Sequence, residues 1–207
     1  AEVIMLFEGE DVKAPFRLQD GELCRFGRVS GGIFREDGDP VAQAVLFCEG
    51  EAVDTTLTDG LYTCDLTGRA APISLRPSKN INTKNGVSTF DLLSIQLHVL
   101  NVEPFTSPYL IIAANADNNG TVSTLDLLDI QQVILNIITE YPNNTSWRFV
   151  PADFVFPTVE SPLDSAFPEE VILPSASVDT MGVDFVGIKV GDVMLDNDPS
   201  EATGKEP

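Results

Sequence analysis

Oxygen-bearing residues alternate with spacers through residues 115–126, in a pattern that suits a calcium ion. They fall at positions 1, 3, 5, 7, 9 and 12 of the loop and are Asn115, Asp117, Asn119, Thr121, Ser123 and Asp126. Ca²⁺ takes about 6–8 oxygen ligands, and position 7 supplies a backbone carbonyl. Gly120 stands at position 6, where the chain must reverse sharply. Only Asp117 and Asp126 are charged, so we expect an affinity near 10⁻⁴–10⁻³ M, as roughly seen in extracellular calcium modules.

A second copy of this pattern lies 35 residues earlier, because segments 88–93 and 123–128 are nearly identical. Its candidate ligands are Asn80, Asn82, Asn85, Ser88 and Asp91. Lys84 occupies position 5 and Gly86 position 7, although a one-residue deletion would restore Asn85 and Gly86 to positions 5 and 6. Asp91 is the only carboxylate. We therefore expect weaker binding here, or a site completed by residues outside the loop, with a metal-free turn held by asparagine side chains as the alternative.

Each loop is expected to lead into a helix. Apolar residues step by three and four along one stripe of each helix, through Leu92, Ile95, Val99 and Val102 and through Leu127, Ile130, Ile134 and Ile137. Two such stripes can bury each other. Between the helices, Ser107 and Pro108 predict a short connecting helix that delivers the chain to Asn115.

The duplicated loop and helix, over residues 78–141, resemble the dockerin fold. The resemblance implies two calcium loops that each lack the entering helix of an EF-hand. It also implies a cohesin partner, contacted at the helix starts through Thr89, Phe90, Thr124 and Leu125 in either of two orientations. These residues could as easily be buried against the rest of the chain, which ordinary dockerins lack.

Residues 26–77 have a different pattern, with short alternating segments at 28–34, 41–48, 61–66 and 73–76. Turn sequences at 36–40 and 58–60 separate them. This order resembles the small Ig-like β-sandwiches of carboxypeptidase regulatory modules, which implies a spacer without common chemistry. Residues 183–193 alternate like a strand. Over residues 26–194 the arrangement is similar to modules at the carboxyl-terminal end of very large secreted bacterial surface proteins.

The predicted fold class is therefore α+β. We expect a segment 1–25 from a preceding domain or linker, the sandwich 26–77, the calcium-binding repeats 78–141, a C-terminal extended or β segment 142–198 packing on the repeats, and a tail 199–207.

Composition indicates the setting. The formal charge of −20, from 32 acids and 12 bases, disfavours nucleic acid and anionic membranes as partners. No apolar run approaches the ~20 residues that span a bilayer. Cys48 and Cys64 flank a candidate hairpin and could pair in an oxidising compartment, which would leave Cys24 without a partner. These features favour an extracellular or cell-surface location.

Catalysis is not indicated. The only histidine, His98, stands at a helix position equivalent to Val133 and is expected to be partly packed. Trp147 is expected to anchor the core rather than to stack on a sugar. The leading hypothesis is a non-catalytic, calcium-stabilised structural or adhesion module, with protein partners or copies of itself in an extracellular filament. The alternative is a dockerin that tethers a polysaccharide-degrading enzyme or scaffold through a cohesin.

Overall fold

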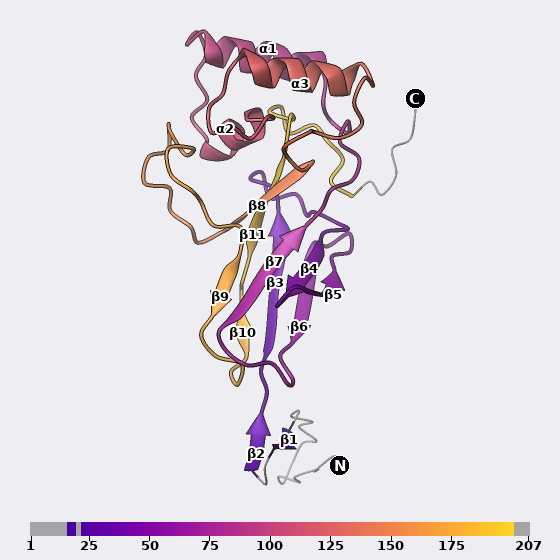
Figure 1. Ribbon diagram of the computed structural model, residues 1–207, viewed down its shortest axis with the longest axis vertical. Helices are drawn as coiled ribbons and strands as arrows, with labels where there is room; N and C mark the ends of the chain where they lie inside the picture. The colour runs from indigo at the N-terminus through magenta and orange to yellow at the C-terminus, as the bar shows by residue number, and fades with distance from the viewer. Residues whose placement is uncertain (1–15, 20–21, 201–207) are drawn as a thin grey trace.

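The computed structural model describes residues 16–19 and 22–200, and these form a mixed α+β fold (Figure 1). Two β-sheets pack face to face, and three helices form a layer at one end of them. The predicted α+β class and a β-sandwich-like arrangement are confirmed. Among the described helices, none is long and apolar enough to cross a membrane.

Both sheets are built from strands of the N-terminal and the C-terminal parts of the chain. One sheet contains β3 (Arg28–Phe34), β6 (Leu61–Asp65), β8 (Trp147–Pro151), β10 (Thr180–Met181) and β11 (Phe185–Lys189). The other has the order β5 (Glu51–Thr55), β4 (Val45–Cys48), β7 (Ile73–Ser78) and β9 (Val171–Leu173). A separate antiparallel hairpin joins β1 (Phe16–Gln19) to β2 (Glu22–Arg25).

The sandwich therefore differs from the expectation that residues 26–77 would form it alone. Strand β3 pairs with β6 on one edge, and β10 and then β11 run parallel to it on the other edge. Closing this edge removes an exposed row of unpaired backbone groups. Gly31 makes the close approach possible, because a Cβ there would lie 1.9 Å from the carbonyl oxygen of Val183. Segment 142–198 thus completes both sheets as well as packing on the helices.

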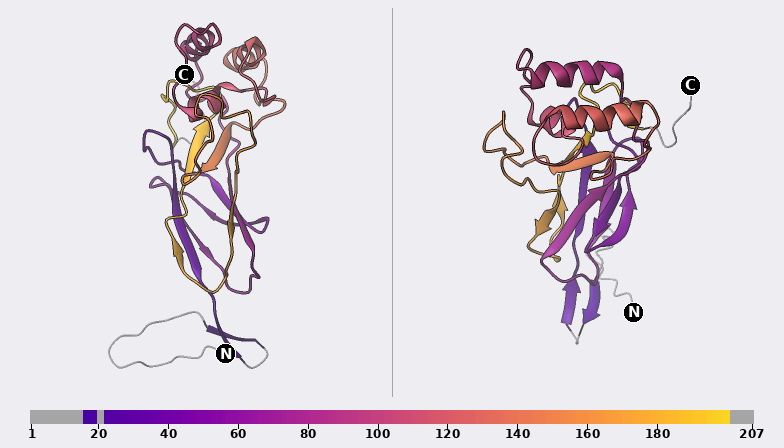
Figure 2. Two further views of the ribbon diagram at one scale, coloured as in Figure 1. Left: turned by 90° about the vertical axis from the view of Figure 1, so that its left-hand side faces the viewer. Right: turned by 45° about the horizontal axis from the view of Figure 1, so that its top comes forward.

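The helical layer consists of α1 (Thr89–Val99), α2 (Pro108–Ala114) and α3 (Thr124–Ile134). Figure 2 shows α1 and α3 side by side, and Figure 1 shows α2 between them and the sheets. The predicted helix 108–114 is confirmed, and the Ser107 hydroxyl accepts a hydrogen bond from the Tyr109 N–H at its start. Ser107 therefore caps this helix as its type predicts.

Two apolar clusters hold the molecule together, one between the sheets and one beneath the helices. Ile95 and Ile130 are fully buried in the second cluster, as the predicted stripes require. The last stripe residues, Val102 and Ile137, are instead exposed, because α1 ends at Val99 and α3 at Ile134. Trp147 is buried in the first cluster, which confirms it as a core anchor.

Candidate metal centre

Loop 115–126 is fixed at both ends by helix termini. Asn115 is the C-terminal cap of α2, and Ser123 is the N-terminal cap of α3. The Ser123 hydroxyl accepts from the Leu125 N–H at 3.2 Å, while the Asp126 carboxylate accepts from the Ser123 N–H at 2.7 Å. This reciprocal capping box places Asp126 at the first turn of α3. Gly120 has φ +88°, the left-handed conformation that the sharp reversal needs.

Within the loop, the predicted ligand residues turn toward one another. Asp117 accepts from the Asn119 N–H at 3.0 Å, and Asn119 accepts from the Thr121 N–H at 2.8 Å through its Oδ1. Asp126 Oδ1 accepts from the Asp117 N–H at 3.1 Å, which joins the first part of the loop to α3. Hydrogen bonds within the loop therefore join five of the six predicted ligand residues, namely Asp117, Asn119, Thr121, Ser123 and Asp126.

Asn115 and Asp126, at the first and last positions of the loop, are both buried. Asn115 is 3% exposed, and its Oδ1 is buried without a hydrogen-bond donor. Asp126 is fully buried, and burial raises the pKa of its carboxyl to about 6, with the nearby Asp117 charge acting in the same direction. Among the described residues, no Lys or Arg forms an ion pair with Asp126. A buried acceptor without a donor is costly, and a cation would satisfy it.

The first loop uses its asparagines differently. Asn80 Oδ1 accepts from the Ser146 N–H at 2.8 Å, and the Asn85 side chain exchanges two hydrogen bonds with the backbone of Asp198. Asn82 has φ +51°, and its carbonyl accepts from Lys189 Nζ at 2.7 Å. Asn80 and Asn85 therefore tie the loop to the sandwich and the C-terminal segment instead of gathering around Asp91. Asparagine side chains thus hold this turn, and metal binding at the first loop stays a prediction.

Asp91 nevertheless lies in a cluster of three carboxylates. Carboxylate oxygens of Asp91, Asp192 and Asp196 lie within 4.8 Å of one another, and Asp91 and Asp192 are fully buried. Burial raises the pKa of Asp192 to about 6, and the Asp91 charge adds to that effect. Sequence reasoning allowed for ligands from outside the loop but did not identify Asp192 and Asp196. Their spacing of four residues directly after Gly191 is a weak signal, visible only once the segment is folded back.

Backbone donors hold Asp91 in this cluster. Its Oδ1 accepts from the Val193 N–H at 2.9 Å and the Met194 N–H at 3.1 Å. Its Oδ2 accepts from the Ser88 N–H and the Ser88 hydroxyl, both at 2.9 Å, which completes a capping box on α1. Asp91 thus joins the start of α1 to the chain just beyond β11.

The turn 143–148 connects the second loop to the sandwich. Asn144 Nδ2 donates to the Asn115 carbonyl at 3.0 Å, and Asn118 Nδ2 donates to the Asn143 carbonyl at 3.2 Å. Arg148 in β8 donates to Asn118 Oδ1 at 2.7 Å. Because Ser146 in the same turn binds Asn80, this one turn is tied to both loops. Because of these contacts, ordering of loop 115–126 would also order the junction between the helices and the sheets.

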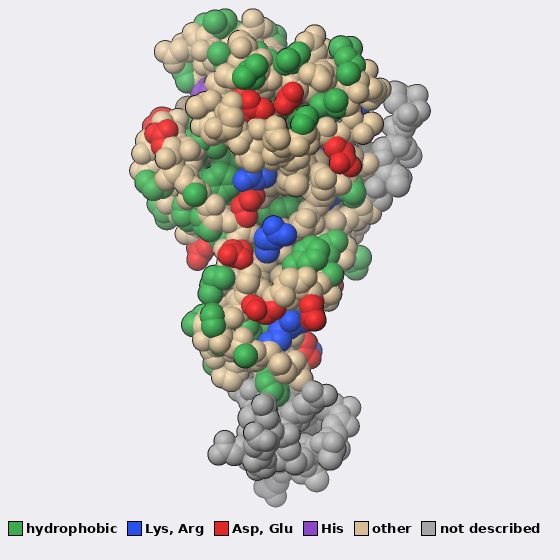
Figure 3. All heavy atoms as spheres, viewed as in Figure 1, with side chains coloured by type: hydrophobic (Ala, Val, Ile, Leu, Met, Phe, Trp, Pro, Cys, Tyr) green, Lys and Arg blue, Asp and Glu red, His purple; other side chains and the backbone are tan. Residues whose placement is uncertain are grey.

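The predicted partner-binding residues lie on the surface. Thr89 and Thr124 are exposed, Phe90 is 69% exposed and Leu125 is 58% exposed. The alternative in which these residues are buried against the rest of the chain is therefore wrong. Figure 3 shows hydrophobic side chains scattered over the helical end, with few charged ones between them.

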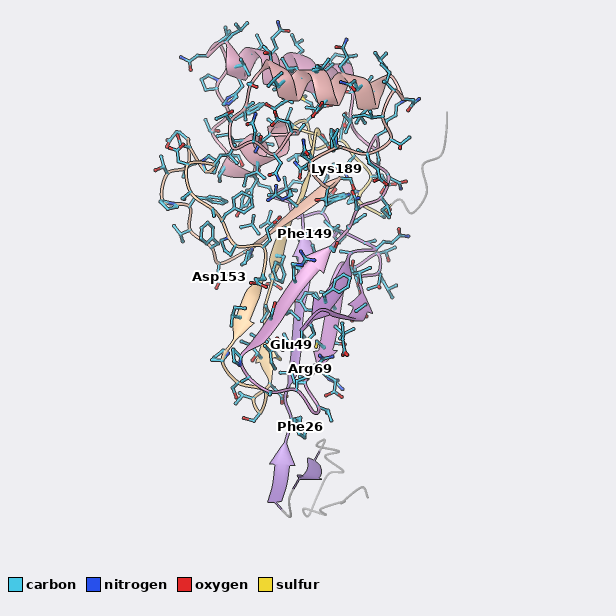
Figure 4. The ribbon with its side chains drawn as sticks, in the orientation of Figure 1. Phe26, Glu49, Arg69, Phe149, Asp153 and Lys189 are labelled. Carbon is cyan, nitrogen blue, oxygen red and sulfur yellow. The ribbon has the colours of Figure 1, made fainter. Side chains whose placement is uncertain are left out.

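His98 and the buried lysines have packing roles. The His98 ring stacks on Phe105 with 4.5 Å between centroids, and its Nδ1 accepts from the Phe105 N–H at 3.0 Å. Burial lowers the pKa of His98. Lys79 Nζ lies 4.8 Å from the Trp147 ring centre. Figure 4 places Lys189 between the helical layer and the sheets, above Phe149.

No family model, curated protein or solved structure matches this chain. The dockerin and carboxypeptidase-regulatory resemblances therefore stay predictions that rest on sequence patterns.

Proposed function

We propose that this protein is a non-catalytic, calcium-stabilised structural module, in which Ca²⁺ fixes a dockerin-like pair of loop-helix repeats onto a β-sandwich. The observation that carries the proposal is the buried Oδ1 of Asn115, which lacks a donor at the first ligand position of loop 115–126. A bound cation would supply a partner for this oxygen and a positive charge beside the buried Asp126 carboxylate.

The donor set favours calcium over other cations. All the proposed ligands in the second loop are amide, hydroxyl, carboxylate or backbone oxygens, without histidine or cysteine. Hard oxygen ligands suit Ca²⁺ and Mg²⁺, whereas zinc prefers nitrogen and sulfur. Mg²⁺ keeps several waters and binds through one or two carboxylates, while Ca²⁺ accepts an irregular cage of many oxygens. A twelve-position loop with alternating ligands provides such a cage.

A second ion at Asp91, Asp192 and Asp196 would complete the first site from outside its loop. Two fully buried carboxylates close to each other repel, and a divalent cation converts that repulsion into attraction. Because Asp192 and Asp196 follow β11, the ion would bridge α1 and the end of the sandwich. Calcium would thus stabilise the junction at two points.

The setting that best suits this role is the outside of a cell. Two charged side chains in the second loop imply weak affinity, roughly 10⁻⁴–10⁻³ M, which extracellular calcium saturates and intracellular calcium does not. The formal charge of −20 adds self-repulsion that bound cations reduce. A module of a secreted surface protein or extracellular filament fits both features.

Calorimetric calcium titration of metal-free protein tests the proposal. Wild-type protein should bind calcium and melt at a higher temperature with calcium than in chelator. Asp117→Asn keeps the shape of the second loop but removes a charge, so it should weaken that site several-fold. Asp153→Asn is the matched control, because Asp153 is exposed and lies outside both loops. Identical melting curves in calcium and chelator would overturn the proposal.

Exposure of the helix starts supports a second candidate function, the docking of a cohesin-like protein. Phe90 and Leu125 occupy equivalent positions of the two repeats, and both are exposed. If either copy can serve, Phe90→Ser or Leu125→Ser alone should leave binding of a purified cohesin nearly unchanged, whereas the double variant should lose it. Absence of binding by wild-type, calcium-loaded protein across a panel of purified cohesins would exclude this candidate.

A further inference from the structure

Two cysteines, one from each sheet, are buried in the core of the sandwich. Cys48 ends β4 in one sheet, and Cys64 lies in β6 of the other sheet. Both are fully buried in the same apolar cluster, and both carry free thiols. Cys64 alternates with exposed neighbours along β6, so its side chain points between the sheets. One thiol from each sheet therefore lies in the same apolar cluster.

The two thiols are close enough to influence each other. Burial raises the pKa of Cys64 to about 12, and the neighbouring Cys48 thiol acts in the same direction. The strand end that carries Cys48 is also held in place, because Arg69 donates to the Cys48 carbonyl at 3.2 Å and pairs with Glu51 at 3.3 Å. Figure 4 shows Arg69 and Glu49 in this lower part of the sandwich.

We propose that Cys48 and Cys64 form a disulfide that links the two sheets when the chain folds in the presence of a disulfide oxidant. One thiolate attacks a sulfur of the oxidant, which releases one thiol and leaves a mixed disulfide on the protein. The second thiolate displaces the remaining oxidant thiol. Two S–H bonds are lost, one S–S bond forms, and the two electrons reduce the oxidant to two thiols.

The order of events follows from burial. The thiolate is the reactive form, and in the folded protein both thiols are shielded from solvent in an apolar cluster. Exchange with an external disulfide should therefore be fast while the sandwich is still open and slow once it has closed. The link is expected to be a product of folding in an oxidising compartment, retained afterwards because reductants reach it poorly.

Refolding from denaturant in a glutathione redox buffer tests the proposal. The protein used is the full chain with Cys24→Ser, which removes the third thiol, and wild-type chain serves for comparison. Peptide mapping without reduction should show Cys48 joined to Cys64 in both proteins. The link closes a loop of about 15 residues, so the oxidised form should melt roughly 6–12 °C above the same protein in reductant.

A second sample tests the alternative that Cys48 and Cys64 merely fill space in the core and do not form a disulfide. Folded, reduced protein given the same redox buffer should oxidise at least about tenfold more slowly than the refolding chain. Free thiols at both positions after oxidative refolding, or a link from Cys24 in the wild-type chain, would overturn the assignment. An oxidised form that melts no higher than the reduced form would also overturn it.

Discussion

Replacing Asp91 by alanine in calcium-free protein should cost more stability than replacing its repeat partner Asp126. The two aspartates occupy equivalent positions and complete equivalent capping boxes on α1 and α3. Asp126 accepts only from residues of its own loop, Ser123 and Asp117. Asp91 accepts in addition from Val193 and Met194, about 100 residues away along the chain. The comparison therefore isolates the link between α1 and the C-terminal segment.

The size of the stability loss can be estimated from the helix cap that each variant loses and from the backbone N–H groups that lose their acceptor. Loss of the capping interaction should cost each variant about 0.5–2 kcal/mol. Asp91→Ala also leaves the buried N–H of Val193 and the partly buried N–H of Met194 without their acceptor, at about 1–3 kcal/mol for a buried donor. Relief of repulsion with Asp192 offsets part of this. The expected difference is about 1–3 kcal/mol, or roughly 2–12 °C in melting temperature for a chain of this size.

Urea and thermal unfolding of both variants in chelator provide the measurement. Calcium titration of the same two proteins is the second readout, because each variant should lose the calcium response of its own loop. Sequence reasoning alone expects Asp126→Ala to damage calcium binding more, since only the second loop also contains Asp117. Equal losses of stability in chelator would refute the structural role assigned to the contacts of Asp91 with the C-terminal segment.

Three further predictions concern charge, the C-terminal contacts and the helices. In metal-free protein, burial raises the pKa of Asp126 to about 6 from its ordinary 3.8. The stability that protonation of Asp126 confers is therefore fully present below pH 3.8 and is lost as the pH rises through 6. Because calcium takes the place of the proton, the increase in melting temperature on adding calcium should be larger at pH 7 than at pH 5, and an equal increase at both pH values would contradict this. Arg35→Met should lower the free energy of unfolding by about 2–4 kcal/mol in urea, because the buried guanidinium donates to Asn197 Oδ1 and pairs with two partly exposed carboxylates; an unchanged midpoint would argue against these contacts. Ile95→Ala should cost about 2–5 kcal/mol and Phe90→Ser less than about 0.5, and similar losses would contradict their opposite burial.

Local features of the helical layer were predictable from the sequence because their causes are local. The repeat offset located both helix starts, and Ser107 with Pro108 located α2. Alternation in the sequence predicted β3, β6 and β7. It did not predict β5, because the side chains of β5 are exposed or partly exposed and form no alternating apolar pattern. Loop 115–126 was likewise identifiable, since each of its candidate ligands is fixed by spacing within twelve positions.

Long-range pairing was not predictable in the same way. The contribution of Asp192 and Asp196 to the cluster around Asp91 depends on the return of the chain through β11, which no periodicity encodes. The same holds for Asn80 and Asn85, whose types suit calcium ligands but whose side chains bind Ser146 and Asp198. Asparagine serves equally as a ligand and as a tether, so only the fold distinguishes the two uses.

The parallel pairing of β3 with β11 has a mechanical consequence. The chain enters β3 at the end near the β1–β2 hairpin and leaves β11 at the opposite end, near the helices (Figure 1). Tension between the two ends of the module would pull these neighbouring strands in opposite directions along their length. Their hydrogen bonds would be sheared together instead of being opened one after another, and forced unfolding would be slow. Such a geometry suits a module that transmits load along its long axis.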